Sequence, residues 1–206
     1  TGFKGSWLSM ILKYLGCKIY GYALMPDKSK SIFKEYKLSN MFKKSTISDV
    51  RNFKNLYKKI ELVKPDIIIH MAAQPLVIDS YKKPYLTFDV NFRGTLNILE
   101  AAKKYRFIKS VICVTSDKCY ENVGKIKGYK ETDMLGGIDP YSASKSSAEL
   151  LIRSYKESFF KENKCGISSV RAGNVIGGGD WSTNRLIPDC IRSLYKNKKI
   201  VLRNPN

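Results

Sequence analysis

The sequence predicts an α/β fold built on a doubly wound parallel sheet. Apolar runs of strand length alternate with segments of helical periodicity, and this alternation implies parallel strands joined by right-handed crossovers. One run, Ile67, Ile68 and Ile69, is uninterrupted, as in a strand that is buried on both faces. The 206 residues are 43% hydrophobic, which suffices for a sizeable core and excludes an intrinsically disordered protein.

The elements follow in the order that such a sheet requires. Helical spacing of apolar residues predicts helices over 6–15, 51–63, 85–105, 140–164 and 185–196. Apolar and β-branched runs predict strands at 17–24, 43–47, 66–71, 110–115, 166–171 and 200–203. Gly16 and Pro65 stand where the first two helices end. Loops rich in glycine or charge occupy 117–138 and 174–184.

The first residues suggest that the sheet lacks a strand. Residues 1–5 run straight into a helix, whereas in a dinucleotide-binding βαβ unit a central strand feeds such a glycine loop. We therefore expect a piece of a longer enzyme, without the first strand and most of the C-terminal substrate domain. Strands 17–24 and 66–71 then have no strand between them. The expected domains are a dinucleotide-binding domain, residues 1–173, and the start of a substrate-binding region, residues 174–206.

The charge of the chain is strongly positive, with 37 Lys and Arg against 18 Asp and Glu and a net charge of +19. The basic residues are mostly lysines spread along the whole length, without a block that marks a binding arm. We therefore favour a solvated lysine surface over a nucleic-acid partner. A basic field also suits a negatively charged substrate such as a nucleotide diphosphate.

Other function classes are excluded by composition. The five cysteines form no CxxC pair, which argues against a disulfide framework. His70 is the only histidine, so a metal site is not expected, and a structural role for this residue is favoured over catalysis. No apolar run approaches the roughly 18 residues of a membrane span, and the first residues do not resemble a signal sequence. We expect a cytoplasmic protein without a membrane partner.

Tyr141 and Lys145 form the most specific chemical pattern. Residues four apart share a face of a helix, so the ammonium of Lys145 can stabilise the phenolate of Tyr141 and lower its pKa. Such a tyrosine is a base for a sugar or alcohol hydroxyl near neutral pH. An exposed helical pair is the alternative.

Ser116, Asp117 and Lys118 follow directly after the strand predicted at 110–115. Ligand sites of open parallel sheets lie at the carboxyl ends of strands, where a hydroxyl, a carboxylate and an amine could converge with Tyr141. The alternative is a simple polar turn.

Gly2 and Gly5 are spaced as the last two glycines of a Gly-x-x-Gly-x-x-Gly loop. Glycines let the backbone approach a pyrophosphate, and the following helix offers free N–H groups. Two glycines three apart also occur by chance in many turns.

Together these motifs resemble the CDP-glucose 4,6-dehydratase family of extended short-chain dehydrogenase/reductases, which have a Rossmann fold. The blocks that carry the resemblance occur in family order at residues 2–8, 72–77, 115–122, 139–145 and 171–181. The resemblance continues to residues 203–205.

The resemblance implies a catalytic role for each of these polar residues. Tyr141, paired with Lys145, takes the proton of the sugar O4 while hydride passes from C4 to NAD, and Ser116 hydrogen-bonds the same oxygen. Asp117 is the general acid for the hydroxyl that leaves C6. Lys118 stands where the related dTDP-glucose dehydratases carry a glutamate and is assigned as the base at C5.

The resemblance also implies the binding residues. NAD is preferred over NADP, although no acidic residue ends the strand at 17–24, where an aspartate usually binds the adenosine ribose. Cofactor contacts are assigned to Gly2, Phe3, Gly5, Asp49, Val50, Ala72, Ala73 and Gln74, with Tyr141 and Lys145. Substrate-nucleotide contacts are assigned to Asn174, Arg185 and Arg203. A helix N-cap is the alternative for Asp49, and helix ends or salt bridges are the alternatives for the arginines.

The resemblance further implies a homodimer formed through the helices at 85–105 and 140–164, and a product used in deoxysugar and O-antigen synthesis. Leu151, Ile152 and Phe159 fit either a dimer interface or the core. Other dTDP-, GDP- or UDP-hexose dehydratases and epimerases remain alternatives, as do a silent nucleotide-binding protein and a nucleic-acid binder. The acid and base at 117 and 118 favour dehydration, because an epimerase needs neither.

Overall fold

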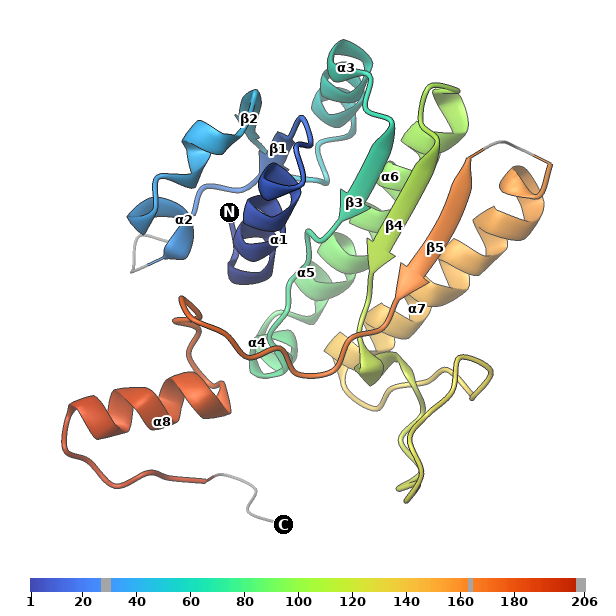
Figure 1. The fold of residues 1–206 in the computed structure, drawn as a ribbon. Helices are drawn as coiled ribbons and strands as arrows, with labels where there is room; N and C mark the ends of the chain where they lie inside the picture. Colours follow the sequence, from blue (N-terminus) through green and yellow to red (C-terminus); the bar gives the residue numbers. More distant parts are fainter. Residues whose placement is uncertain (27–30, 163–164, 203–206) are drawn as a thin grey trace. The chain divides into compact units, whose positions relative to one another are not determined.

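The computed structural model describes residues 1–26, 31–162 and 165–202. The described strands form two parallel sheets, one of β1 and β2 and one with the strand order β3-β4-β5 (Figure 1). The predicted α/β class with parallel strands is confirmed. The chain divides into two compact units: unit 1 comprises residues 1–47 and the described residues from 174 onward, and unit 2 comprises residues 48–173.

Unit 1 carries the glycine loop and the last helix. Its elements are α1 (Phe3–Tyr14), β1 (Tyr20–Ala23), α2 (Ile32–Glu35), the 3-10 helix η1 (Leu38–Met41), β2 (Lys44–Ile47) and α8 (Leu186–Tyr195). α1 packs against α2 and η1. The buried apolar residues of these two short helices are Ile32, Phe33 and Leu38.

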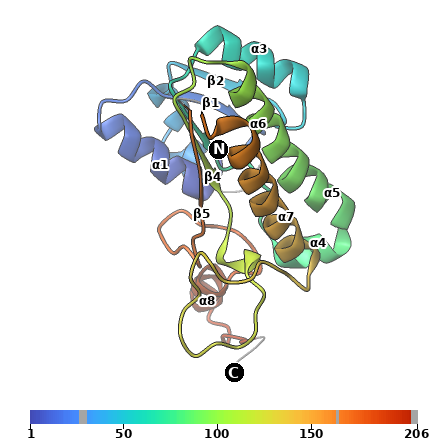
Figure 2. The same ribbon diagram turned by 90° about the vertical axis from the view of Figure 1, so that its right-hand side faces the viewer.

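Unit 2 is a layer of helices on one face of the three-stranded sheet (Figures 1 and 2). Its helices are α3 (Phe53–Val63), α4 (Val77–Lys82), α5 (Pro84–Phe88), the π-helix η2 (Asp89–Arg93), α6 (Gly94–Lys104), the 3-10 helix η3 (Asp117–Cys119), α7 (Pro140–Tyr155) and the π-helix η4 (Lys156–Phe160). Its strands are β3 (Ile67–His70), β4 (Ser110–Val114) and β5 (Gly166–Val170). α6 packs on β4, and α7 packs on β5.

Local sequence sets the ends of the helices that frame the site. The side chain of Asn52 accepts a hydrogen bond from the Asn55 amide at 3.1 Å and starts α3. Asp139 does the same for α7 by accepting from the Ser142 amide at 3.0 Å, and Pro140 occupies the first helical turn. The Asp139 cap places Tyr141 in the first turn of α7.

The register of the second sheet brings the ends of its strands together. His70 pairs with Cys113 in the β3–β4 ladder, and Val114 pairs with Val170 in the β4–β5 ladder. The carboxyl ends of the three strands therefore lie at one edge of the sheet. The buried apolar side chains of this unit include Val111 on β4 and Leu99 on α6.

The structure corrects several predicted boundaries. The helix expected over 85–105 is interrupted by η2, and the helix expected to reach 164 ends its α-helical part at Tyr155 before η4. A π-turn inserts one residue into an α-helix, and the apolar spacing on either side of it remains helical, so periodicity alone does not reveal it. Residues 200–202 form no strand, and position 203 lies outside the described residues.

Strands 17–24 and 66–71 correspond to β1 and β3, which belong to different sheets. The helices of the described residues include none that is both long and apolar enough to cross a membrane.

Candidate functional site

Three segments that follow the strands of unit 2 meet at the carboxyl edge of its sheet. Backbone pairing between two of them continues past the strands, because the Thr115 amide donates to the Val170 carbonyl at 2.9 Å and the Asp117 amide donates to the Ala172 carbonyl at 3.1 Å. The residues after β4 are therefore held against the residues after β5. This is where the sequence places its catalytic candidates.

Residues 116–118, here called the 116–118 turn, form a compact polar corner. The Ser116 hydroxyl donates to Oδ1 of Asp117 at 3.0 Å and accepts from the Lys118 amide at 3.2 Å. Ser116 is buried, whereas Asp117 and Lys118 are exposed. The turn thus presents an acid and an amine beside a hydroxyl that the protein already orients.

Tyr141 and Lys145 lie on α7, which packs against η3 of the 116–118 turn. Both residues are buried, with 8% and 6% of their surfaces exposed. The ammonium of Lys145 donates to the Val114 carbonyl at 3.4 Å. Gly137 lets the incoming loop lie against α7, because a Cβ there would approach the Ala143 amide nitrogen to 2.6 Å. The structure therefore brings the predicted catalytic residues of α7 and the 116–118 turn together.

Asn91 joins α7 to the loop after β3. Its carboxamide oxygen accepts from the Gln74 amide at 2.8 Å, and its Nδ2 donates to the Ser144 hydroxyl at 2.8 Å. Asn91 sits in η2, and π-turns often re-aim a side chain at a functional site. The segment assigned to the cofactor, Ala72 to Gln74, is thereby anchored to the helix of Tyr141.

His70 ends β3 and is fully enclosed. Its Nε2 lies 3.2 Å from the Thr95 hydroxyl. Burial, with a smaller contribution from Lys145, lowers the pKa of His70 to about 3. A neutral, hydrogen-bonded histidine fits the structural role predicted for it. The described residues contain no group of three or more His, Cys, Asp or Glu arranged to hold a metal ion.

Asp49 and Val50 lie between β2 and α3. Asp49 accepts hydrogen bonds from the Arg51 side chain at 2.7 and 3.0 Å, and these bonds lower the pKa of its carboxyl. The helix N-cap alternative for Asp49 is wrong, because Asn52 caps α3. The carbonyl of Val50 accepts from Asn97 at 2.9 Å.

Gly2, Phe3 and Gly5 form the start of α1 in unit 1. Gly2 is the N-cap but offers no side-chain cap, and the first turn carries no acidic residue. A Cβ at Gly2 or Gly5 would meet no described atom within 4 Å. Burial, and then the nearby Arg185, lower the pKa of Lys4. The amino end of α1 therefore has no side-chain cap and no acidic residue in its first turn, and Lys4 and Arg185 add positive charge near it.

The three substrate candidates have different settings. Asn174 is exposed in the loop after β5. Arg185 precedes α8 and pairs with Asp180 at 3.1 Å. Arg203 lies outside the described residues.

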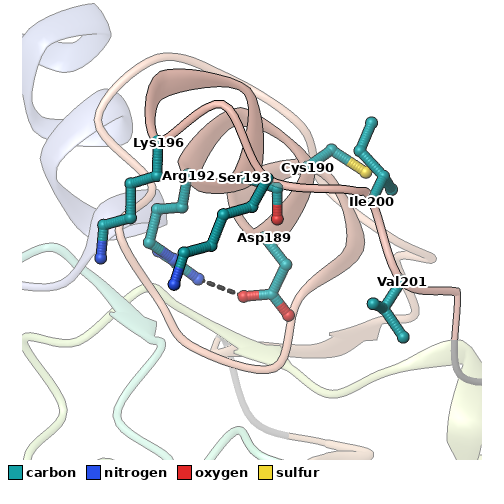
Figure 3. Close-up of a pocket in the computed structure, with 8 residues that line it drawn as sticks. Asp189, Cys190, Arg192, Ser193, Lys196, Ile200 and Val201 are labelled. Atoms are coloured by element: carbon teal, nitrogen blue, oxygen red, sulfur yellow. Dashed lines mark hydrogen bonds and ion pairs between the residues drawn. The ribbon is translucent and has the colours of Figure 1, made fainter.

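A pocket lies at the carboxyl-terminal end of α8, where Arg192 pairs with Asp189 beside Lys196 (Figure 3). Its lining includes none of the predicted site residues that the structure describes.

Sequence reasoning missed a buried ion pair beside the site. Nη2 of Arg171 lies 2.8 Å from Oε2 of Glu149, which is 4% exposed. Glu149 also accepts hydrogen bonds from the hydroxyls of Thr115 and Ser169. The available signal was spacing, because Glu149 lies one helical step of four residues beyond Lys145.

Comparison with known families shows to which family the chain belongs. The family described as GDP-mannose 4,6 dehydratase matches residues 1–204. The chain belongs to this family. As a member of the GDP-mannose 4,6 dehydratase family, it is 47% identical over 210 residues to the CDP-glucose 4,6-dehydratase of Salmonella typhimurium, a match that covers 100% of the chain and 58% of the relative. The resemblance inferred from the motifs is thereby confirmed.

Two further proteins show lower sequence identity to the chain. The dTDP-D-glucose 4,6-dehydratase of Dictyostelium discoideum is 32% identical over 98% of the chain and 48% of its own length. The structure of dTDP-glucose 4,6-dehydratase from Bacillus anthracis in complex with NAD has a TM-score of 0.80 and 23% identity, covering 99% of the chain and 62% of that structure. This likeness shows that the fold is shared. The chain spans less than two thirds of the length of each of these relatives.

Proposed function

We propose that the chain is the dinucleotide-binding part of an NAD-dependent lyase that converts CDP-glucose to CDP-4-dehydro-6-deoxyglucose. The observation that carries the proposal is the packing of the 116–118 turn against the helix that bears Tyr141 and Lys145. This arrangement offers a base for a sugar hydroxyl beside a separate acid and amine. The choice of CDP-glucose is supported by the 47% identity to the Salmonella enzyme of that name.

The amino end of α1 fits a dinucleotide. Gly2 and Gly5 leave open space where side chains would stand, and no acidic residue opposes a phosphate in the first turn. In this proposal Gly2, Phe3 and Gly5 face the pyrophosphate. The remaining cofactor contacts come from Asp49, Val50, Ala72, Ala73 and Gln74, with Tyr141 and Lys145. When bound, NAD supplies the hydride acceptor for C4 and the hydride donor for C6.

Tyr141 holds the first proton transfer of the proposed reaction. Its phenolate oxygen accepts the proton of the sugar O4, and the positive charge of Lys145 favours that phenolate. Ser116 donates a hydrogen bond to the same oxygen, for which its hydroxyl turns away from Oδ1 of Asp117, its acceptor in the structure. The hydrogen bond between Lys145 and the Val114 carbonyl, 3.4 Å long, holds the ammonium at this end of the sheet.

Asp117 and Lys118 handle the elimination of water. The 4-ketone acidifies the C5 hydrogen, Lys118 removes that proton, and Asp117 protonates the hydroxyl that leaves C6. A lysine acts as a base only when its amine is deprotonated, and burial away from water favours that state. Lys118 is exposed in the structure. The proposal therefore requires that the bound substrate exclude water from the Lys118 amine.

Lys118→Ala tests this assignment. We expect the variant to retain C4 oxidation but to lose exchange of the C5 hydrogen with solvent, as measured by mass spectrometry in deuterated water. Unchanged C5 exchange would remove Lys118 from the role of base.

The substrate diphosphate is assigned to Asn174, Arg185 and Arg203. Arginines suit a diphosphate because the guanidinium group makes forked hydrogen bonds to phosphate oxygens. Arg185 already pairs with Asp180 at 3.1 Å, which fixes its direction. In this proposal Arg185 exchanges the Asp180 carboxylate for the diphosphate when the substrate binds.

The proposal extends to the assembly and location of the enzyme. A homodimer through α6, α7 and the adjoining η4 is supported by the exposure of Phe159 on η4 and of Leu150 on α7, each 48% exposed, and by the partial exposure of Leu151, whereas Ile152 belongs to the core. A cytoplasmic location is supported by five cysteines that are all free. The product is proposed to enter deoxysugar synthesis for surface polysaccharide such as O-antigen.

A substrate panel tests the proposed function. The complete open reading frame that encodes the chain is incubated with NAD and, separately, with CDP-, dTDP-, GDP- and UDP-hexoses, and product masses are read. We expect loss of one water from CDP-glucose alone. Loss of water from another nucleotide sugar would overturn the nucleotide assignment and keep the chemistry. Unchanged mass with every substrate would contradict the dehydratase and favour an epimerase or a binding protein.

A further inference from the structure

Glu149 occupies an unusual place on α7. It lies four residues beyond Lys145 and eight beyond Tyr141, so the three side chains share one face of the helix. All three are buried. Lys145 donates to the carbonyl of Val114, and Glu149 accepts from the hydroxyl of the next residue, Thr115. Side chains of α7 are therefore hydrogen-bonded to Val114 and Thr115, the two residues immediately before the 116–118 turn.

Arg171, which follows directly after β5, contacts both α7 and the 116–118 turn. It pairs with Oε2 of Glu149 at 2.8 Å. The carbonyls on either side of it, from Val170 and Ala172, accept the amides of Thr115 and Asp117 at 2.9 and 3.1 Å. One residue thus joins α7, the end of β5 and the backbone of the 116–118 turn.

The same guanidinium also contacts the loop that leads to α7. It lies 4.9 Å from the centre of the Tyr120 ring, and its Nη1 donates to the Glu131 carbonyl at 3.2 Å. Tyr120 pairs with Leu135 in an antiparallel bridge. The loop after the 116–118 turn is therefore tied to the same ion pair.

We propose that the Glu149–Arg171 ion pair is the positioning element that keeps the 116–118 turn in register with the catalytic helix. The inference rests on the proposed function, because it concerns the same site. Neither residue touches the reacting atoms in this account, and both act through Thr115 and the backbone of the turn.

The chemistry of the pair supports a charged, fixed state. Burial alone would raise the pKa of Glu149, but hydrogen bonds from Arg171, Thr115 and Ser169 lower it below its ordinary value. Removal of Arg171 alone leaves a buried charge without its partner, which is strongly destabilising, whereas replacing both charges by apolar residues of similar size is often neutral. A variant that lacks both charges can therefore keep the stability of the fold while it loses the positioning of the 116–118 turn.

The test compares Arg171→Met with the double variant Glu149→Leu/Arg171→Met in the complete open reading frame. Arg171→Met is expected to fold poorly, and the double variant is expected to unfold at the same urea concentration as the wild type. If the pair positions the turn, the double variant still loses roughly 10- to 100-fold in kcat with a KM within about threefold. Wild-type kcat in a stable double variant would overturn the proposal.

Thr115 supplies an independent pair of variants. Thr115→Val removes the hydroxyl that donates a hydrogen bond to Glu149 and is expected to lower kcat in the same way. Thr115→Ser keeps a hydroxyl at this position and is expected to have the kcat of the wild type. Lys109→Met is the matched control, because the Lys109–Asp66 ion pair is exposed and joins the amino ends of β3 and β4, away from the 116–118 turn. Equal kcat values for Thr115→Val and the wild type would also contradict the proposal.

Hydrogen exchange separates this inference from the proposed function. We expect amides of residues 115–121 to exchange faster in the double variant than in the wild type, while those of α6 stay unchanged. If the wild type dehydrates no nucleotide sugar, the proposed function fails and the exchange comparison still decides the inference. Identical exchange at 115–121 in both proteins would overturn it.

Discussion

The carboxyl edge of the sheet in unit 2 and the amino end of α1 in unit 1 treat polar groups in opposite ways. In unit 2, Asn91, Ser144, Lys145 and Glu149 are all buried and hydrogen-bonded to other protein groups. In unit 1, α1 buries only Ser6, α8 buries no residue, and the N-cap of α1 has no side-chain hydrogen bond.

This difference corresponds to two requirements of the proposed reaction. Groups that move protons must stand within a fraction of an ångström of their working positions, and unit 2 fixes them by internal hydrogen bonds. Backbone groups that hold a phosphate must stay free for it, and unit 1 leaves them free. The contrast predicts that changes in unit 2 act on chemistry and stability, whereas changes at the glycine loop act on cofactor affinity.

The largest effect is expected at Tyr141. Tyr141→Phe keeps the ring in its buried place but removes the oxygen that accepts the O4 proton. General acid–base groups contribute roughly 10²- to 10⁴-fold, so kcat for dehydration should fall by that factor with little change in the unfolding midpoint. Tyr195→Phe is the control, because Tyr195 is 86% exposed on α8. A Tyr141→Phe enzyme with wild-type kcat would break the assignment of chemistry to unit 2.

Two leucines compare the contributions of the units to stability. Leu99 on α6 is 0% exposed, whereas Leu194 on α8 is 61% exposed. Leu99→Ala should lower the free energy of unfolding by about 2–5 kcal/mol through lost burial and a cavity. Leu194→Ala should change it by less than about 0.5 kcal/mol. Urea unfolding followed by circular dichroism measures both, and equal losses would contradict the comparison.

The glycine loop is tested by Gly5→Val. A Cβ at this position meets no described atom within 4 Å, so stability should be unchanged while the space for a pyrophosphate is reduced. We expect NAD affinity to fall roughly tenfold, or about 1.4 kcal/mol, in a calorimetric titration. Gly128→Val is the matched control, since Gly128 in unit 2 is equally open. Unaltered NAD binding by Gly5→Val would exclude this glycine from the cofactor site.

The last effect concerns pH and arises in unit 2, where the only histidine of the chain, His70, is buried. The pKa of His70 falls from 6.5 to about 3 on folding. Below pH 6.5 the unfolded chain binds a proton that the folded chain does not, so stability drops as the pH falls from 6.5 toward 3. The slope is at most about 1.4 kcal/mol per pH unit. His70→Gln should remove this contribution between pH 6.5 and 5, and an unchanged pH dependence would contradict it.

The sequence predicted the parts of the fold that periodicity encodes. The apolar runs at 66–71 and 110–115 predicted β3 and β4 almost to the residue, because apolar β-branched segments favour strands of a parallel sheet. The strand expected at 43–47 also matches β2, although this segment is mostly polar and exposed. The segment between β1 and β2 was uncertain, and it contains α2 and η1. Their few buried residues are too short a pattern to mark a helix.

The site was predictable where spacing fixes geometry. Tyr141 and Lys145 share a helix face, and the 116–118 turn follows a strand, so their meeting follows from general rules of parallel sheets. Glu149 and Arg171 could not be placed in the same way. A glutamate and an arginine far apart in sequence usually indicate solvated surface, and only the packing of α7 on β5 brings them together.

The most direct test of the account is the product formed from CDP-glucose and NAD in deuterated water by the complete open reading frame. We expect a product that has lost one water and carries one solvent deuterium at C5, because in the proposed mechanism Lys118 removes the C5 proton and Asp117 protonates the departing C6 hydroxyl. A product of unchanged elemental composition, or one that lost water without gaining deuterium, would contradict it.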